Sequence, residues 1–385
     1  MINKVNFISK FKELKTPFYF YNTDILKNTL ASLSRSILPN NKVHYAIKAN
    51  SNERLLEIIK EYSLGIDAVS YNEIRAAINC GFKSKDIVFA GVGKSDEEII
   101  NAIKNKISYF NCESLEEIKV IDGLSKILNV KTNVSIRINP NIKTNTHKNI
   151  QTGSSDDKFG IDVNSISDIL TSISRLNNIS IVGIHFHIGS QIRSHDSFLK
   201  LSVIANDLNK FFYERNYDIK IINVGGGLSI DYDNPLENIY PEFKSFFNIY
   251  NDNIKLRKNQ NIHFELGRSI VGQCGFLISR VLFEKESFNN HFLILDSGMN
   301  NLIRPALYNA SHKIINISSS KSSIKNYNIV GPLCESSDTF AENYQLIESK
   351  RGDMISICSA GAYGESMSSN YNLREDIKSY FSDTI

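Results

Sequence analysis

The chain has 385 residues, a length that predicts two domains, and its 42% hydrophobic and 22% charged residues are typical of a globular protein rather than a disordered one. Its 44 Lys and Arg residues against 41 Asp and Glu residues leave a formal charge of +3, too small to indicate a nucleic-acid partner. Its five cysteines form no CxxC pair, which argues against a disulfide framework and a zinc ribbon.

The N-terminal residues carry no recognisable targeting segment. Residues 1–14 read MINKVNFISKFKEL and lack the apolar core of a signal peptide. The sequence has no run of about 18 apolar residues, so it predicts no membrane span. We therefore expect a cytoplasmic protein without a membrane or nucleic-acid partner.

From Lys42 onward, short β-rich runs alternate with amphipathic stretches whose apolar residues recur at helical spacing. The predicted strands are residues 43–47, 65–69, 87–90, 107–111, 133–138, 179–188, 219–224 and 262–266. The predicted helices between them include residues 53–62, 71–79, 96–104, 114–127 and 197–214, and three of them follow a capping serine at Ser70, Ser95 or Ser114. Eight such units favour a (β/α)8 barrel. A doubly wound open sheet is the alternative, because strand order cannot be read from one sequence.

The remainder of the chain predicts a different architecture. From Gly272 on, strand-like segments at 276–282, 292–295, 328–330 and 354–358 follow one another without long helices. They predict a mostly β domain, built as a β-barrel or sandwich, with which an early strand at 17–21 could pair. We therefore expect an α/β plus β chain, with a (β/α)8 barrel over 25–270 and a second domain formed by 1–24 together with 271–385.

Chemically useful side chains gather where the predicted barrel strands end. Barrel enzymes build their sites from the loops at the C-terminal ends of the strands. In this chain the ends of the predicted strands and the loops that follow them carry Lys48, Asp67, His185, His187, Ser190, Gly225, Gly226, Gly227, Glu265, Gly267 and Arg268. Each has an ordinary explanation, since a lone Lys is usually solvated, a strand His is usually packed and a glycine run is usually a turn. Their coincidence at one end of the barrel is what favours a site.

Together these residues suit pyridoxal phosphate. Gly225, Gly226 and Gly227 would let backbone N–H groups approach a phosphate, and Arg268 would add a guanidinium at the usual phosphate position of a barrel. The side-chain amine of Lys48 can form a Schiff base with an aldehyde when it is deprotonated. An aromatic His can stack on the cofactor ring, and Glu265 can keep the ring nitrogen protonated, which makes the cofactor a stronger electron sink.

The predicted second domain holds another set of reactive groups. Cys334 lies beside Glu335 in the segment GPLCESSD, although a free thiol is most often buried and structural. Arg304, Tyr308 and Tyr363 stand in segments rich in groups that bind carboxylate or phosphate. Taken alone, a surface Arg and packed Tyr side chains would explain these last three residues.

The motifs occur in a recognisable order from about Thr16 to Leu373. They are YAIKAN at 45–50, DAVS at 67–70, NP at 139–140, TH at 146–147, KFG at 158–160, HFHIGSQ at 185–191, GGG at 225–227, ELGR at 265–268, RPALY at 304–308, CE at 334–335 and MSSNYN at 367–372. In this order they resemble the fold-type III pyridoxal-phosphate decarboxylases, and most closely those that act on diaminopimelate.

The resemblance implies a pyridoxal 5'-phosphate enzyme and a role for each residue. Lys48 would hold the cofactor covalently, His187 would stack on its ring, and Glu265 would pair with the ring nitrogen. The remaining cofactor contacts would come from Asp67, Ser190, Gly225, Gly226, Gly227, Gly267, Arg268 and Tyr363. The resemblance also implies a homodimer with a shared active site, in which the partner subunit contributes the Cys334 loop and Cys334 is the proton donor after carbon dioxide leaves.

The substrate can be argued from charge. Diaminopimelate bound by one end leaves a second amino-acid head, whose carboxylate needs a cation and whose ammonium needs an anion. The residues that match these needs are Arg268, Arg304, Tyr308, Glu335 and Tyr363. We therefore expect decarboxylation of meso-2,6-diaminopimelate to L-lysine, the last step of bacterial lysine biosynthesis. A decarboxylase of ornithine, arginine or lysine on the same fold is the alternative, although ornithine or lysine would leave Arg304 without a partner.

Other functions match the sequence less well. An alanine racemase would use a Tyr as its second base, and a non-catalytic paralogue would tend to lose Lys48 or Cys334. A metal-dependent barrel hydrolase would need more ligands at strand ends than His185 and His187, so we expect no metal. Departures from the family pattern are Ser337 where Gly is usual, Tyr71-Asn72 where Gly-Gly is common, Leu266 where Pro is frequent, and Leu373 to Asp376 where Arg-Pro-Arg often follows.

Overall fold

The computed structural model describes residues 5–142 and 157–385, so the TH motif at 146–147 lies outside the described residues. The chain divides into two compact units. We call Leu30–Ser229 with Glu242–Gly267 the barrel unit, and Met1–Thr29 with Ile230–Pro241 and Arg268–Ile385 the β unit. Within the described residues, no helix combines the length and hydropathy needed to cross a lipid bilayer.

The barrel unit is built on a closed parallel sheet. Its strands are β2 (Asn41–Ala46), β3 (Gly65–Ala68), β4 (Ile87–Phe89), β5 (Tyr109–Cys112), β6 (Thr132–Asn139), β8 (Ile179–His185), β9 (Ile221–Asn223) and β10 (Asn261–Leu266), and the two-residue strand β7 (Ile161–Asp162) pairs with β6. The strands pair in the order β5-β4-β3-β2-β10-β9-β8-β6, and β6 also pairs with β5. This last pairing closes the sheet, which confirms the predicted barrel and excludes the open doubly wound alternative.

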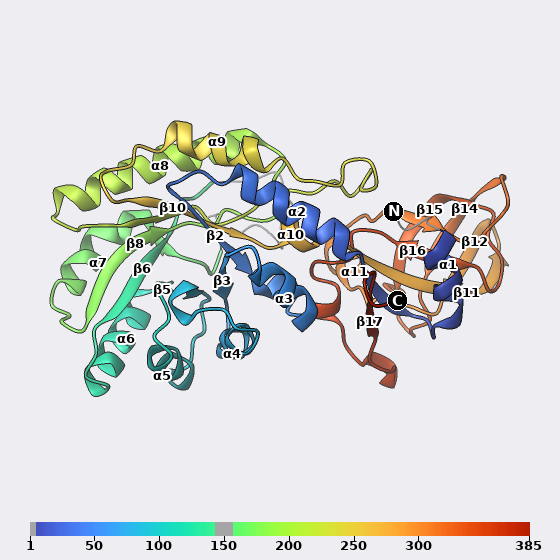
Figure 1. Cartoon of the computed structure of the whole chain (residues 1–385), viewed down its shortest axis with the longest axis horizontal. Coiled ribbons are helices and arrows are strands. Elements are labelled where there is room, and N and C mark those ends of the chain that lie inside the picture. Colours follow the sequence, from blue (N-terminus) through green and yellow to red (C-terminus); the bar gives the residue numbers. More distant parts are fainter. Residues whose placement is uncertain (1–4, 143–156) are drawn as a thin grey trace. The chain divides into compact units, whose positions relative to one another are not determined.

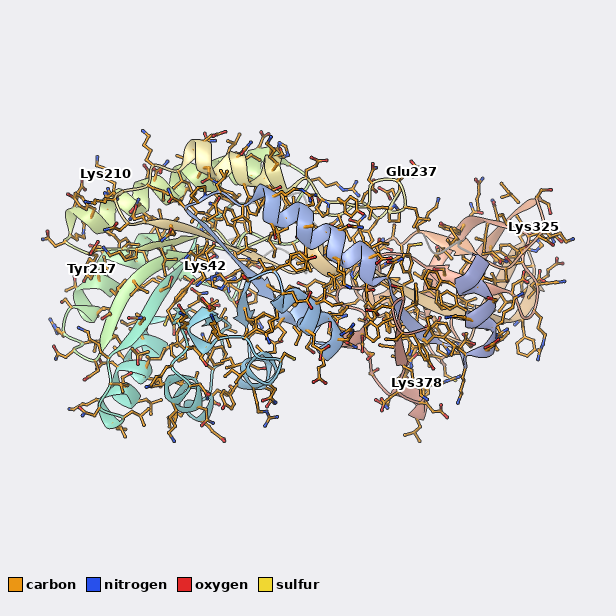
Figure 2. The ribbon with its side chains drawn as sticks, viewed as in Figure 1. Lys42, Lys210, Tyr217, Glu237, Lys325 and Lys378 are labelled. Carbon is orange, nitrogen blue, oxygen red and sulfur yellow. The ribbon has the colours of Figure 1, made fainter. Side chains whose placement is uncertain are left out.

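Helices connect the strands and lie outside them (Figure 1). They are α3 (Glu53–Lys60), α4 (Tyr71–Asn79), α5 (Asp96–Lys104), α6 (Leu115–Ile127), α7 (Ile166–Ile173), α8 (His195–Glu214) and α9 (Phe243–Asn253), preceded by α2 (Thr23–Ser36). The capping serines Ser70, Ser95 and Ser114 each accept a hydrogen bond from the backbone N–H three residues later, as predicted. Charged side chains such as Lys210 on α8 are exposed to solvent (Figure 2).

The register of the parallel strands explains why polar groups meet at one end of the barrel. Ala46 pairs with Asp67, His185 pairs with both Arg137 and Asn223, and Asn223 pairs with His263. Because parallel strands run in one direction, their last residues gather at the same rim. Residues that follow each strand are therefore brought together although they are far apart in the sequence.

The β unit contains the predicted mostly β domain. Its strands are β1 (Phe18–Tyr21), β11 (Gly275–Ser287), β12 (Asn290–Leu295), β13 (Ile314–Asn316), β14 (Ile324–Val330), β15 (Thr339–Ile347), β16 (Met354–Ile357) and β17 (Lys378–Phe381). They pair in the order β13-β16-β11-β12-β14-β15, and β1 pairs with β11 and β17. The short helices are α1 (Val5–Glu13), α10 (Arg268–Val271) and α11 (Arg304–Tyr308).

The early strand β1 pairs with the C-terminal part of the chain, as predicted. Phe18 stands opposite Ile278 in an antiparallel ladder with β11, and opposite Lys378 in a parallel ladder with β17. All four β1 side chains are buried, and the ring of Phe20 lies 4.8 Å from that of Phe11 in an edge-on contact. This aromatic packing ties the N-terminal segment to the β unit.

Candidate active site

Lys48 follows β2, and Asp67 lies in the neighbouring strand β3 of the barrel unit. Lys48 lies in the 3-10 turn η1 (Ile47–Ala49) directly after β2, and its side chain is 37% exposed. Its Nζ is 3.7 Å from Oδ2 of Asp67, which lies within β3. The Asp67 carboxylate is fully buried, and neither of its oxygens has a hydrogen-bond partner among the described residues. An amine therefore stands beside a buried acid at the rim of the barrel.

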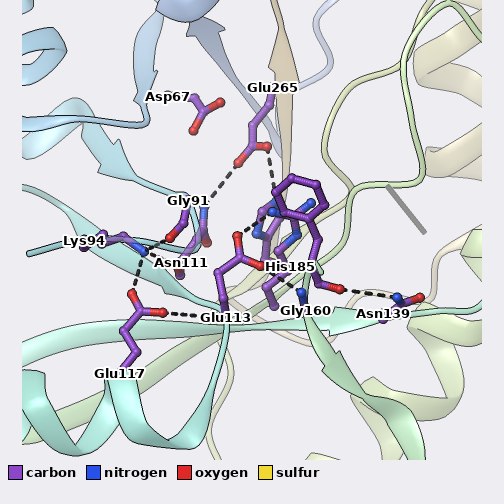
Figure 3. Close-up of polar contacts among 12 residues, drawn as sticks. Asp67, Gly91, Lys94, Asn111, Glu113, Glu117, Asn139, Gly160, His185 and Glu265 are labelled. Carbon is purple, nitrogen blue, oxygen red and sulfur yellow. Dashed lines mark hydrogen bonds and ion pairs between the residues drawn. The ribbon is translucent and has the colours of Figure 1, made fainter. Parts of the chain in front are cut away.

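The carboxylate of Glu265, near the end of β10, is contacted by three polar side chains. Its Oε2 lies 3.1 Å from Nε2 of His185, and its Oε1 accepts hydrogen bonds from Nδ2 of Asn223 at 2.7 Å and from Nδ2 of Asn111 at 3.2 Å. Figure 3 shows Asn111 and His185 converging on this carboxylate from two sides. Such a carboxylate is buried yet surrounded by donors.

The two carboxylates of the site titrate in opposite directions. Burial raises the pKa of Asp67 well above its ordinary value, and the negative charge of Glu265 raises it further. Burial acts on Glu265 in the same sense, but the charge and hydrogen bond of His185 outweigh it and hold the pKa of Glu265 below its ordinary range. One carboxyl thus favours its protonated form and the other its ionised form, a division of roles often found in active sites.

His187 and the glycine run form the next part of the rim. The backbone N–H of Gly226 donates to Nδ1 of His187 at 3.2 Å, which makes this nitrogen an acceptor and places the proton of a neutral ring on Nε2. Burial and the positive charge of Lys48 lower the pKa of His187 well below its ordinary value, so the ring is neutral. Ser190 lies three residues further along, half-buried.

The glycine run has room for no side chain. Gly225 has φ +71°, and a Cβ at Gly226 would overlap the carbonyl oxygen of Glu265. The N–H of Gly225 donates to Oδ1 of Asn223 at 2.9 Å. At Gly267 a Cβ would crowd Ala46 and Ala49 on the strand and turn that carry Lys48. Glycine is required at these positions because backbone approaches backbone closely.

The KFG motif is anchored by an ion pair in the barrel unit. Glu113 pairs with Arg137 and accepts the backbone N–H of Gly160 at 2.8 Å. The guanidinium of Arg137 also lies 4.7 Å from the ring centre of Phe159. These contacts, drawn in part in Figure 3, fix the start of the segment that leads to β7.

The β unit holds a separate cluster of two buried arginines. Arg268 at the start of α10 donates from NH1 to the Tyr232 hydroxyl at 2.7 Å, and its guanidinium lies 4.9 Å from the ring centre of Tyr363. Arg304 at the start of α11 lies 4.6 Å from the ring centre of Tyr232. The two guanidiniums therefore share one tyrosine, and both side chains are buried. Tyr308, at the end of α11, is half-buried.

Arg304 is held by neutral groups. Its NH1 lies 2.7 Å from Nε2 of His312, while Nδ1 of His312 lies 2.8 Å from the backbone oxygen of Cys358. A carbonyl can only accept, so Nδ1 carries the proton and Nε2 accepts from Arg304. Burial and the charge of Arg304 lower the pKa of His312 to about 3. Nε of Arg304 has no partner, and no ion pair joins this residue to a carboxylate within the described part of the chain.

The loop that carries Cys334 is exposed, and hydrogen bonds to neighbouring residues hold it in place. The N–H of Cys334 donates to Oδ1 of Asn372 at 3.2 Å, and Glu335 accepts from the Tyr371 hydroxyl at 2.5 Å. Asp338 accepts the N–H groups of Leu333 at 2.8 Å and Met299 at 2.6 Å, which closes the base of the loop. The Cys334 thiol is therefore presented to solvent on a loop whose backbone is tied down at both ends.

Four residues that contact the predicted site residues escaped the sequence analysis. Asn111 is the residue before the last of β5 and Asn223 is the last of β9, so the rule that polar residues gather at strand ends would have found them. Tyr232 and His312 carry no such signal, because each lies in a loop and is brought to the buried arginines only by the fold: Tyr232 contacts Arg268 and Arg304, and His312 contacts Arg304.

The barrel residues fit pyridoxal phosphate. An ionised carboxylate stands ready for a ring N–H, an amine for an aldehyde, a neutral imidazole for the ring face, and a turn without side chains for a phosphate. The buried carboxylate of Asp67, with no hydrogen-bond donor of its own, can accept a further polar group. No group of three or more His, Cys, Asp or Glu side chains suited to a metal ion occurs among residues 5–142 and 157–385.

Comparison with known proteins gives a consistent picture. Residues 26–272 match the family described as pyridoxal-dependent decarboxylase, pyridoxal binding domain. A diaminopimelate decarboxylase of Bacteroides thetaiotaomicron is 47% identical over 380 residues, which cover 98% of each chain. The crystal structure of diaminopimelate decarboxylase from Helicobacter pylori complexed with L-lysine superposes with a TM-score of 0.91 at 36% identity, over 98% of this chain and 94% of that one. An arginine decarboxylase of Paramecium bursaria Chlorella virus shares the fold, with a TM-score of 0.88 at 21% identity, over 99% of this chain and 100% of that one.

Proposed function

The chain belongs to the family of pyridoxal-dependent decarboxylases, and from that premise we propose that it decarboxylates meso-2,6-diaminopimelate to L-lysine and carbon dioxide. It is a carboxy-lyase that depends on pyridoxal 5'-phosphate, and its reaction is the last step of bacterial lysine biosynthesis. The 47% identity covers both units and almost the whole of the relative, so the assignment does not rest on the barrel unit alone.

In this proposal the barrel unit holds the cofactor. Lys48 would bind it covalently, His187 would stack on its ring, and Glu265 would pair with its ring nitrogen. The other contacts within this unit would come from Asp67, Ser190, Gly225, Gly226, Gly227 and Gly267. The low pKa of Glu265 supports its assignment, because only an ionised carboxylate can stabilise a protonated ring nitrogen.

The observation that carries the choice of substrate is the state of Arg304. Arg304 is 4% exposed, its guanidinium rests on a neutral imidazole and a tyrosine ring, and its Nε has no hydrogen-bond partner among the described residues. A buried cation without a carboxylate is costly, so an anionic ligand would be strongly favoured there. The second carboxylate of diaminopimelate meets that need, whereas the side chains of ornithine and arginine end in cations. Arg268, Tyr308 and Tyr363 would complete the carboxylate contacts, and Glu335 would bind the distal ammonium.

The chain's own groups then divide the reaction. Bound pyridoxal phosphate supplies the electron sink that takes up the electron pair left when carbon dioxide departs. Lys48 would hold the cofactor through its side-chain amine, next to the carboxylate of Asp67. Glu265 would keep the ring nitrogen protonated, and the Cys334 thiol would supply the proton that replaces the lost carboxylate on carbon.

We also propose a homodimer in the cytoplasm. Cys334 and Glu335 are exposed, and the side chains of Tyr371 and Leu373 close to them are exposed as well. Residues that serve catalysis from such a surface would gain their partners from a second subunit, as the family resemblance implies. All five cysteines are free thiols, which is the usual state in a reducing compartment.

A substrate panel tests the proposed reaction. The purified protein, supplied with pyridoxal phosphate, should release carbon dioxide from meso-2,6-diaminopimelate and form L-lysine. Release from L-ornithine, L-arginine or L-lysine should be lower by orders of magnitude. Faster release from any of these three would replace the proposed substrate by that amino acid, while leaving the reaction type in place.

A further inference from the structure

The hydrogen bonds around Glu265 assign a role to residues that touch neither substrate nor the reacting atoms. We propose that Asn111 and Asn223 are positioning residues, which hold Glu265 ionised and oriented toward the cofactor's ring nitrogen. The inference deepens the proposed function and rests on it.

The orientation of the Asn223 amide is fixed by its two partners. Its Oδ1 accepts the N–H of Gly225 at 2.9 Å, so its Nδ2 must face Glu265, to which it donates at 2.7 Å. Asn223 therefore links the carboxylate to the glycine run at its own strand's end. A displacement of either group is transmitted to the other through one buried amide, which is fully enclosed.

Asn111 is held from its backbone. Its carbonyl oxygen accepts from Nζ of Lys94 at 2.9 Å, and the same ammonium donates to the oxygen of Gly91 at 2.8 Å and pairs with Glu117 at 2.5 Å. The Lys94 side chain is 1% exposed, so this ion pair is part of the interior. Figure 3 shows the chain of contacts from Glu117 through Lys94 and Asn111 to Glu265. The backbone of Asn111 is thus held in place by Lys94 while its side chain donates a hydrogen bond to Glu265.

The energetics favour this role over simple packing. Two amide donors on Oε1 and the imidazole on Oε2 stabilise the charged form of Glu265 against a burial that opposes it. If a donor is removed, the carboxylate becomes more basic, and the shared proton moves from the ring nitrogen toward Glu265. A hydrogen bond to a charged group accounts for about a tenfold change in such a ratio.

The test uses the full-length protein loaded with pyridoxal phosphate labelled with ¹⁵N in the ring, because the ¹⁵N chemical shift reports directly where the proton lies. The variants are Asn111→Leu, Asn223→Leu and the control Asn209→Leu. Asn111→Leu is the cleaner probe, since among residues 5–142 and 157–385 nothing bonds to Oδ1 of Asn111, and the substitution removes only the hydrogen bond to Glu265. Asn209 is an equally buried amide on α8 whose side chain bonds to Gln260.

In the wild-type protein the resonance should lie at the pyridinium position. It should move toward the neutral-pyridine position in Asn111→Leu, and further in Asn223→Leu, which loses the shorter bond and the contact with Gly225. Both variants should also lose about tenfold in kcat, while Asn209→Leu keeps the wild-type shift.

Three results would overturn the inference. The first is a resonance unchanged in Asn111→Leu with the cofactor still bound; this variant decides the matter if Asn223→Leu does not fold. The second is an equal displacement in Asn209→Leu, which would show that any buried amide has the same effect. The third is the absence of a bound-cofactor resonance in the wild-type protein, and this result alone would also overturn the proposed function.

Discussion

The barrel unit and the β unit each bury a charged side chain, and they stabilise it in opposite ways. In the barrel unit, the Glu265 carboxylate receives hydrogen bonds from two amides and faces an imidazole. In the β unit, the Arg304 guanidinium rests on a neutral imidazole and an aromatic ring, and its Nε has no hydrogen-bond partner in the part of the chain that the structure describes. The Glu265 carboxylate is stabilised by side chains of its own unit. The Arg304 guanidinium contacts only neutral groups in the described structure, so an anionic ligand would stabilise it further.

The pKa directions state the same difference. Burial alone would raise the pKa of Glu265, yet the donors around it prevail and lower the pKa. For Arg304 burial prevails, and the nearby charge of Arg268 also lowers its pKa. A preorganised charge of the first kind serves chemistry, since it costs no rearrangement when the cofactor's charge must be stabilised. A charge of the second kind serves recognition, since its stabilisation depends on the ligand.

The largest expected effect follows from removing the preorganised charge. Glu265→Gln keeps the shape of the side chain but cannot hold the ring nitrogen protonated, so kcat should fall by about 10²–10³-fold. Steady-state kinetics with saturating pyridoxal phosphate measures it, and Glu97→Gln on the exposed face of α5 is the control. A kcat within a few fold of wild type would mean that the carboxylate's charge is not needed.

Removing the positive charge of Arg304 should weaken substrate binding. Arg304→Met should raise the KM for meso-2,6-diaminopimelate by about 10–100-fold and leave kcat nearly unchanged, because the lost contact is to the non-reacting end. Inhibition by L-lysine, which retains the distal head, should weaken alongside. Inhibition by the diamine cadaverine, which has no carboxylate, should not change. Arg280→Met in β11 is the control, and an equal loss for cadaverine would contradict the assignment.

A smaller effect concerns the pH dependence of stability. His312 has a pKa of about 3 in the folded chain against 6.5 ordinarily, so between these values the unfolded chain binds the additional proton. The free energy of unfolding should therefore fall as the pH drops below about 6.5, at a rate approaching about 1.4 kcal/mol per pH unit. His312→Gln can replace both hydrogen bonds without titrating. The difference in Tm between about pH 7 and about pH 5 should be smaller in this variant, and an unchanged difference would exclude His312 as its source.

The smallest effect is expected at Ser337, where the sequence of the Cys334 loop departs from the family pattern. Ser337 stands where the family usually has Gly, but its backbone does not adopt a positive φ, and its hydroxyl lies 3.5 Å from the sulfur of Met299. The turn therefore does not require glycine here. Ser337→Gly should change kcat and KM by less than about twofold, with a stability loss of about 0.5–1 kcal/mol from added chain freedom. A large gain in activity would show that the serine impairs the loop.

The comparison also shows what could be predicted from the sequence. The barrel strands were predictable because each is a short apolar run between amphipathic helices, and parallel strands must bring their polar ends together. Lys48, His187 and Glu265 follow from that rule, and so would Asn111 and Asn223. The edge strand β15 was not predicted, because its sequence TFAENYQLI buries only Phe340 and Leu346 and reads as a polar loop.

The surroundings of the buried arginine Arg304 in the β unit were only partly predictable from the sequence. Arg304 stood out by its motif, but its supports Tyr232 and His312 are 72 and 8 residues away from it in the chain and lie in loops without periodicity. Their positions depend on tertiary packing, in which Ile230–Pro241 joins the β unit although it lies between two segments of the barrel unit. No local pattern encodes such a placement.

The covalent attachment of the cofactor at Lys48 is the central claim, and one measurement tests it most directly. The protein loaded with pyridoxal phosphate is reduced with borohydride, digested, and analysed by peptide mass spectrometry. The cofactor's mass should be found on Lys48 and should disappear from the digest of Lys48→Ala. A label on another lysine of the wild-type protein, with Lys48 unmodified, would contradict the account.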